Sequence, residues 1–432
     1  MSVLAAPGAG PIWRGGWRDG LRYGGLGLPL SFVALPLYVV LPDHYGAALG
    51  VPLGWLGAVL LGARLLDAWV DPWIGRRVDA LLAHSARRAW TVAAAFGALL
   101  AIAFTALFHP PFTRAPALLA WCAVWLVLAC LGYSVVGVIH QAWGARLGGS
   151  ERQRSSIVAW REGLALAGVL LASVLPGLGG FGLSAAVLAT TLVLGLALLR
   201  SAPWRAEPRA STASIAASAG LSAPLSDLAF RRLLAIYLVN GIASAVPATL
   251  VLFFVRDRLQ AAAFAPFFLA AYFAAAALAM PLWLRAVGRF GLARSWLAAM
   301  LLSVGVFAGA GLLGSGDVAA YAAVCVASGA ALAADLVVPG ALLAGVIQRG
   351  AGAGRMEGAF VGWWNFATKL NLALAAGLAL PALQAFGYAP GARDAAALQA
   401  LTLAYCALPC ALKLIAAALL HRIWISNPDT AP

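Results

Sequence analysis

Charged side chains are scarce in this chain of 432 residues, because Asp, Glu, Lys and Arg together make up only 10% of it. Soluble domains typically carry about 25%. Lysine is almost absent, and its two examples are Lys369 and Lys413. Hydrophobic residues, by contrast, account for 63% of the chain. This balance excludes an ordinary soluble protein and predicts an all-α membrane protein with many spanning helices.

Sequence motifs of enzymes and ATP-driven pumps are missing as well. The chain has no phosphate-binding glycine loop, no zinc-ligand spacing and no nucleophile motif. Its five cysteines lie in apolar runs, which favours packed helix residues over disulfides or metal ligands. The first twenty residues lack the apolar core of a cleavable signal peptide. We therefore expect no enzyme and no bound cofactor.

The formal net charge of +14 comes almost entirely from arginines in short polar segments. In a membrane protein such arginines set topology, so nucleic-acid binding is not expected. If both termini are cytoplasmic, the outer side receives few of them, namely Arg114, Arg256, Arg258 and Arg393. The bias predicts a multi-pass protein of a bacterial-type inner membrane with both termini in the cytoplasm.

Twelve apolar segments are long enough to span a bilayer, since about 20 apolar residues suffice. They begin near Leu21, Val51, Ala89, Pro116, Ile157, Phe181, Arg232, Ala262, Ser295, Val318, Ala359 and Ala395. An Ala/Ser/Pro-rich stretch at 201–230 predicts a cytoplasmic linker between a six-helix half at 1–200 and another at 231–432.

The most informative stretch runs from Leu60 to Asp79, where charges interrupt an apolar helix. Arg64, Asp67 and Asp71 are spaced i, i+3 and i+7, so one helical face carries all three. Two carboxylates one turn apart repel each other, which favours a bound cation or a shared proton. Alternatively, Asp67 only neutralises Arg64, or Asp71 only caps the following loop.

The pattern R-x-x-D-x-x-x-D-P-x-x-G-x-x-x-D in this stretch resembles the second helix and following loop of the glycoside–pentoside–hexuronide:cation symporters. That family is a branch of the major facilitator superfamily. The resemblance implies a major facilitator fold of twelve helices in two halves, and alternating access. It also implies a conformational loop motif, made by Arg64, Pro72, Gly75 and Asp79 in the first half and by Arg355 and Glu357 in the second.

In the resembling family, Asp67 and Asp71 correspond to positions that bind the coupling cation. Melibiose permease of that family has a third carboxylate, whose place Ile139 takes here. The loss favours H⁺ as the coupling ion, while Na⁺ remains an alternative through Ser134 or main-chain oxygens. His140 is a candidate proton relay or, alternatively, a hydrogen-bonded residue at the helix end.

Substrate-binding candidates also follow from the resemblance. Tyr133 belongs to a family-like pattern in the fourth helix, and Arg161 resembles an arginine that helps to hold substrate. Trp364 offers a stacking surface for a sugar ring or acyl chain, or it belongs to an interfacial aromatic belt. Pro29 takes the place of the aspartate that binds sugar in melibiose permease.

The two lysines lead to different expectations. Lys369 resembles a family lysine near the cation site, so we pair it with Asp71 or Asp67 and count it among the substrate-binding candidates. Lys413 lies in the last helix, where its long side chain can reach toward the cytoplasm.

The sequence therefore predicts a secondary active transporter that carries a small solute, a sugar or glycoside, in symport with H⁺ or Na⁺. One alternative is a lysophospholipid or other amphiphile symporter of the same fold. A second is a membrane sensor or partner subunit that does not transport. The expected partners are the substrate and the lipid bilayer, and we expect a monomer.

Overall fold

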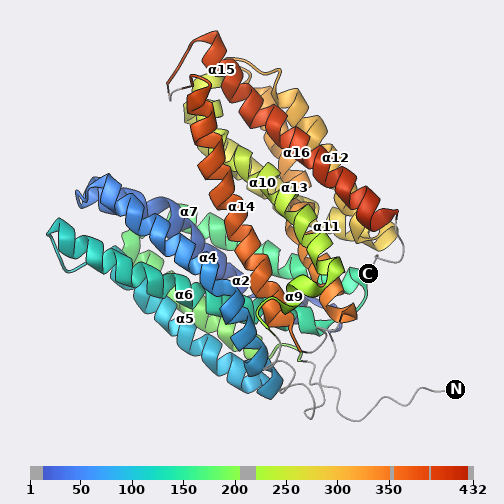
Figure 1. Cartoon of the computed structure of the whole chain (residues 1–432). Helices are drawn as coiled ribbons and strands as arrows, with labels where there is room; N and C mark the ends of the chain where they lie inside the picture. Colours follow the sequence, from blue (N-terminus) through green and yellow to red (C-terminus); the bar gives the residue numbers. More distant parts are fainter. Residues whose placement is uncertain (1–12, 205–219, 351–354, 389–390, 427–432) are drawn as a thin grey trace. The chain divides into compact units, whose positions relative to one another are not determined.

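The computed structural model describes residues 13–204, 220–350, 355–388 and 391–426 (Figure 1). The chain divides into two compact units. Unit 1 comprises Met1–Ser226 and Ile347–Phe366, and unit 2 comprises Asp227–Val346 and Ala367–Pro432. Throughout the described ranges the regular structure is helical. The predicted all-α fold is confirmed.

Unit 1 begins with helices α1 (Trp17–Gly24) and α2 (Gly27–Leu35). A π-helical turn at Pro36–Val40, the short α3 (Leu41–Asp43) and a second π turn at His44–Ala48 continue the same segment. Prolines cause these interruptions, because a proline has no N–H to donate to the preceding turn. The first predicted span is thus an interrupted helix.

The remaining helices of unit 1 are longer. They are α4 (Leu53–His84), α5 (Ala86–Phe108), α6 (Ala115–Leu147) and α7 (Glu151–Arg200). Helix α7 contains two spans, because Gly179 and Gly180 leave the helical conformation and Gly180 has φ +67°. Helices α4 and α5 both pack against α6, while α2 packs against α7. The short α9 (Ala223–Ser226) also belongs to this unit.

Unit 2 contains α10 (Leu228–Phe253), α11 (Ala265–Phe290), α12 (Leu292–Ala310), α15 (Ala395–Thr402) and α16 (Leu408–Leu420). A 3₁₀ turn at Ala262–Phe264 precedes α11. Three π turns extend or join the helices, at Phe254–Arg258, Leu403–Ala407 and His421–Ile425. A cluster of buried aromatic and apolar side chains around Phe254, Tyr321 and Tyr405 forms a core at one end of this unit.

Two further helices take part in both units. Helix α13 (Val318–Arg349) lies in unit 2 up to Val346, and its last residues belong to unit 1. Helix α14 (Glu357–Ala385) begins in unit 1 and passes into unit 2 after Phe366.

Within the described part of the chain, nine helices are long and apolar enough to cross a membrane. The three other predicted spans correspond to the interrupted segment 17–48, to the charged helix α4 and to α14. The proposed division at 1–200, 201–230 and 231–432 stays a prediction. Residues 205–219 of its linker lie outside the described residues.

Candidate functional site

The carboxylates of α4 lie inside the protein. Asp67 is buried and Asp71 has no exposed surface, whereas the neighbouring Arg64 is exposed. The hydroxyl of Ser134 on α6 donates a hydrogen bond to Oδ1 of Asp67 at 2.7 Å. The structure thus brings together three of the four residues predicted for cation coupling, namely Asp67, Asp71 and Ser134.

His140, the fourth predicted coupling residue, is held by a different neighbour. Its Nε2 atom lies 2.8 Å from the main-chain oxygen of Tyr23, and the two rings are 4.6 Å apart between centroids. His140 is fully enclosed at this position, nearly two turns beyond Ser134 on α6. Tyr133, predicted to contact substrate, is half-buried beside Ser134.

Arg161 of α7 forms an ion pair with its neighbour in sequence. Its Nε and Nη2 atoms both donate to Oε1 of Glu162, at 2.9 and 2.7 Å. Both side chains are partly open, with 17% and 20% of their surface exposed. The pair is neutral overall, yet it retains further N–H donors and acceptor lone pairs for a polar ligand.

The predicted loop motif gathers around the beginning of α14, within unit 1. The main-chain N–H groups of Gly358 and Ala359 donate to Oδ1 and Oδ2 of Asp79, at 2.6 and 2.8 Å. Asp79 therefore supplies two acceptor oxygens to the first turn of α14, where N–H groups lack helical partners. Gly75 and Gly358 approach so closely that a Cβ atom on either one would meet the carbonyl oxygen of the other.

A buried ion pair lies beside this contact. Nη2 of Arg146, at the end of α6, lies 3.0 Å from Oε2 of Glu357, and these side chains are 6% and 3% exposed. Nη1 of Arg146 also donates to the main-chain oxygen of Leu82 on α4. Arg146 thus ties the ends of α4 and α6 to α14, a role that sequence analysis missed because this arginine resembles the other loop arginines.

Pro72 and Arg355 of the predicted motif lie near these contacts, whereas Arg64 is an exposed residue three turns before Gly75 on α4. Pro72 is buried in α4, and its Cα and the main-chain oxygen of Asp71 face Gly362 of α14. Arg355 is half-buried in the turn before α14. Trp364 is buried in the part of α14 that belongs to unit 1, whereas Lys369 lies in unit 2. The pairing of Lys369 with a carboxylate of α4 therefore stays a prediction.

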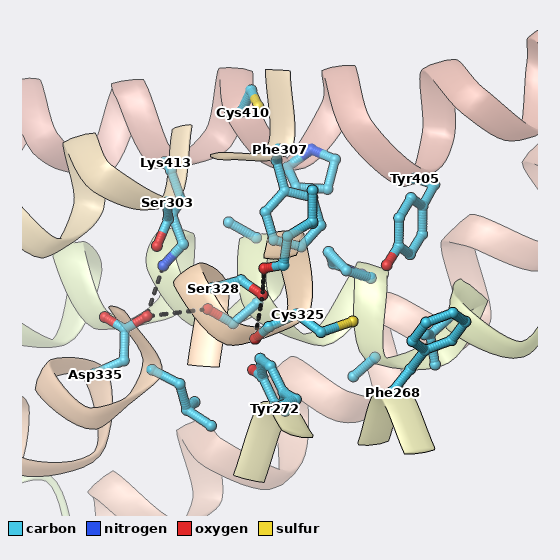
Figure 2. Close-up of a pocket in the computed structure, with 18 of the residues that line it drawn as sticks. Phe268, Tyr272, Ser303, Phe307, Cys325, Ser328, Asp335, Tyr405, Cys410 and Lys413 are labelled. Carbon is cyan, nitrogen blue, oxygen red and sulfur yellow. Dashed lines mark hydrogen bonds and ion pairs between the residues drawn. The ribbon is translucent and has the colours of Figure 1, made fainter. Parts of the chain in front are cut away.

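A second charged cluster, in unit 2, overturns one expectation. Lys413 of α16 does not extend toward the cytoplasm, because its Nζ atom forms an ion pair with Oδ2 of Asp335 on α13 at 2.7 Å (Figure 2). The pair is nearly enclosed, with 8% and 12% of the two side chains exposed. A buried ammonium retains its charge only with such partners. Here the partners are far from Lys413 in the sequence, so the sequence alone does not reveal them.

Three other side chains complete this cluster. Asn240 of α10 accepts from Lys413 at 2.9 Å and donates to Asp335 at 3.2 Å. The indole N–H of Trp296 donates to Asp335 at 2.7 Å, and the Ser244 hydroxyl does so at 3.5 Å. The sequence signal for this cluster was three single polar residues in separate apolar helices, Asn240, Asp335 and Lys413.

Residues 22–427, which are nearly the whole chain, match the family described as MFS/sugar transport protein. The chain belongs to this family. The resemblance to glycoside–pentoside–hexuronide:cation symporters is confirmed, and the family is one of transport proteins rather than enzymes.

Curated relatives from Escherichia coli (strain K12) match over part of the chain. The inner membrane symporter YicJ is 32% identical over 133 residues, which are 30% of this chain and 28% of YicJ. The putative glycoside/cation symporter YagG is 28% identical over 159 residues, or 36% of this chain and 34% of YagG. The matched region thus spans about a third of the length of these family members.

Solved structures share the fold at low sequence identity. A bacterial homologue of the iron transporter ferroportin, in an outward-facing state, has a TM-score of 0.71 and 15% identity, with 93% of this chain and 98% of that chain covered. The major facilitator transporter FucP in the outward conformation has a TM-score of 0.59 and 13% identity, with 92% and 98% covered. The major facilitator fold is confirmed, and these likenesses concern the fold alone.

Proposed function

We propose that this chain is a secondary active transporter that moves a sugar or glycoside across an inner membrane together with a cation, H⁺ or Na⁺. The single observation that carries the proposal is the burial of Asp67 and Asp71 on a helix of a membrane transport protein, with Ser134 hydrogen-bonded to Asp67. The names of the partial relatives YicJ and YagG support the symport component.

The coupling step rests on the cost of a charge inside a membrane. A lone carboxylate at the centre of a bilayer costs about 2.5–3.5 kcal/mol on insertion scales. Uptake of a proton or Na⁺ by Asp67 or Asp71 offsets this cost and changes which conformation is favoured. Ser134 would orient Asp67 in either case, and its oxygen would supply one further ligand to Na⁺.

The gating step uses the beginning of α14. Asp79 and Arg146 hold its first turn within unit 1, while the same helix continues into unit 2. In an alternating-access cycle, release and re-formation of these contacts would accompany the change of access. The loop motif would then act on conformation and leave the ion and the substrate to other residues.

Substrate contact is assigned to Tyr133, Arg161, Trp364 and Lys369. The open edge of the Arg161–Glu162 pair offers donors and acceptors of the kind that sugar hydroxyls need. Lys369 is assigned from the family resemblance. An amphiphile remains the second candidate substrate, because Pro29 replaces the sugar-binding aspartate and is buried in α2.

The experiment is uptake into proteoliposomes that contain the purified full-length protein. A panel of glycosides and one lysophospholipid is applied under an imposed pH gradient, or under a Na⁺ gradient at constant pH. We expect glycoside uptake that follows one of the gradients and falls at least about tenfold in Asp71→Asn, since loss of the ionisable group removes coupling. Asp227→Asn is the matched control, because Asp227 only caps α10 and Asn caps equally well.

Intact gradient-driven uptake by Asp71→Asn would refute the coupling assignment. Uptake of the lysophospholipid without any glycoside would transfer the proposal to amphiphiles. If folded protein moved neither class of molecule under either gradient, the transport proposal itself would be wrong.

A further inference from the structure

A cavity of about 210 Å³ lies inside unit 2, among α10, α11, α12, α13 and α16 (Figure 2). Among its described lining residues, none belongs to the carboxylate site on α4 or to the loop motif. Lys413 and Asp335 line one end, and aromatic and aliphatic side chains with a few hydroxyl and thiol groups line the rest. This arrangement has one charged end and a mostly apolar wall.

The polar end offers a hydrogen-bond donor. An ammonium group has three N–H donors, and Lys413 directs two of them to Asp335 and Asn240. Within the described residues, no protein acceptor is recorded for the third. Asp335 already accepts from Lys413, Asn240, Trp296 and Ser244, so its oxygens are occupied. A ligand at this end therefore needs an acceptor oxygen.

The charge at this end excludes ionic ligands. Lys413 and Asp335 neutralise each other at 2.7 Å. An anion would bring an uncompensated negative charge beside this nearly enclosed pair, and a cation would meet the ammonium group. Burial of an unpaired charge is strongly unfavourable. The geometry favours a neutral ligand.

The wall of the cavity favours an aromatic ring over a sugar. The hydroxyls of Tyr321 and Tyr405 bond to each other at 2.7 Å, and Ser328 donates to the main-chain oxygen of Val324. Tyr272 and Ser303 add two further hydroxyl groups, but a sugar carries more hydroxyls than this wall can pair, so several would be left without partners. Aromatic rings, in contrast, pack favourably edge-on or offset against one another. The lining supplies the following rings: Phe268, Tyr272, Phe273, Phe307, Tyr321 and Tyr405.

We propose that this cavity binds a small neutral molecule with one aromatic ring and one hydroxyl group, a phenol in the simplest case. The hydroxyl oxygen accepts the third N–H of Lys413, its O–H donates to the hydroxyl oxygen of Ser303, which also lines the cavity, and the ring lies among the aromatic side chains. The size is suitable, because an engineered apolar cavity of about 150 Å³ binds benzene. This site is additional to the proposed transport function and does not rest on it.

The test measures the binding of 4-fluorophenol to the full-length protein in lipid nanodiscs. The ¹⁹F line width of the probe reports how much of it is bound. Empty nanodiscs correct for partition into lipid. We expect saturable binding, about tenfold weaker binding of fluorobenzene, which lacks the acceptor oxygen, and similarly weak binding of the anion 4-fluorobenzoate. Val324→Phe and Ser328→Leu fill the cavity from α13 and should each abolish saturable binding.

Leu278→Phe is the matched control, because Leu278 lies on α11 with 78% of its surface exposed and does not line the cavity. It should bind the probe as the unaltered protein does. Folding of each variant is checked by its melting temperature, and either cavity-filling variant suffices if the other does not fold. Equal binding in the filled variants, tighter binding of the benzoate, or no saturable binding to the unaltered protein would each overturn the proposal.

Discussion

Asp79 and Gly358 are 279 residues apart in sequence, yet the main-chain N–H of Gly358 donates to Oδ1 of Asp79 at 2.6 Å. The second oxygen of Asp79 accepts from Ala359, so one carboxylate serves two N–H groups at the beginning of α14. The acid of the loop motif therefore caps the first turn of a distant helix. Both of these hydrogen bonds come from main-chain N–H groups and neither comes from a charged side chain.

Replacement of Asp79 by Asn should lower the stability of unit 1. An amide has one acceptor oxygen where the carboxyl group uses two, so one N–H of α14 loses its partner. We expect a loss of about 1–3 kcal/mol, read as a lower melting temperature in detergent. Asp227→Asn, which changes the cap of α10 in the same way, should be nearly neutral. Equal shifts in the two variants would contradict this account.

Arg146 and Glu357 form a buried ion pair, and replacing either residue alone should destabilise the protein. Arg146→Met or Glu357→Gln leaves the other group without its ion partner, at a cost of about 3–5 kcal/mol. The double variant should lose less than the sum of the two, because neither charge of this pair is then left without the other. A double-mutant cycle on melting temperature or denaturant unfolding measures this coupling. Additive losses would show that the pair contributes nothing as a pair.

Gly75 should not tolerate a methyl group. A Cβ atom there would meet the main-chain oxygen of Gly358, so Gly75→Ala must displace the beginning of α14 from α4. We expect lower stability and slower transport in proteoliposomes. Gly62→Ala, on the same helix with open space around it, should be neutral or slightly stabilising, by about 0.5–1 kcal/mol. If both variants behaved alike, the close approach of the two backbones would not explain a requirement for glycine at position 75.

Lys413→Met should destabilise unit 2 strongly. It leaves the carboxylate of Asp335 enclosed without its cation, at a cost of about 3–5 kcal/mol. Asp335→Asn in the same chain should restore much of the loss, since both charges are then absent. Leu414→Met is a control at the adjacent, exposed position on α16. The measurement is the melting temperature of the unaltered protein, of Lys413→Met, of the double variant and of Leu414→Met. An unchanged melting temperature in Lys413→Met would argue that the lysine is solvated.

Most of the fold could be predicted from the sequence, because a bilayer requires long apolar runs and gives each run a minimum length. Pro36 and Pro42, at which the first span is interrupted, are visible in the sequence, and a proline weakens the helix around it. The combination of Asp67, Asp71 and Ser134 followed from helical spacing and the family resemblance. These inferences used information that lies within one helix or one short motif.

Partners from distant helices could not be predicted in the same way. Lys413 was placed at the membrane surface because a single lysine near a chain end has a simple local explanation. Its actual partners, Asp335 and Asn240, lie on α13 and α10. Arg146 likewise has the sequence surroundings of a topology-setting arginine in a short polar segment, although it is buried against Glu357. Pair distances across a helical bundle depend on packing, which composition and spacing do not specify.

The break at Gly179 and Gly180 has a consequence for how the chain enters a membrane. The runs Glu151–Pro176 and Leu178–Arg200 are each long enough to cross, and the non-helical Gly179 and Gly180 lie at the beginning of the second run. So short a connection leaves no hydrophilic loop to be carried across the bilayer on its own. The two spans are therefore suited to insertion together, as one helical hairpin, and the far side of the membrane would receive only a turn.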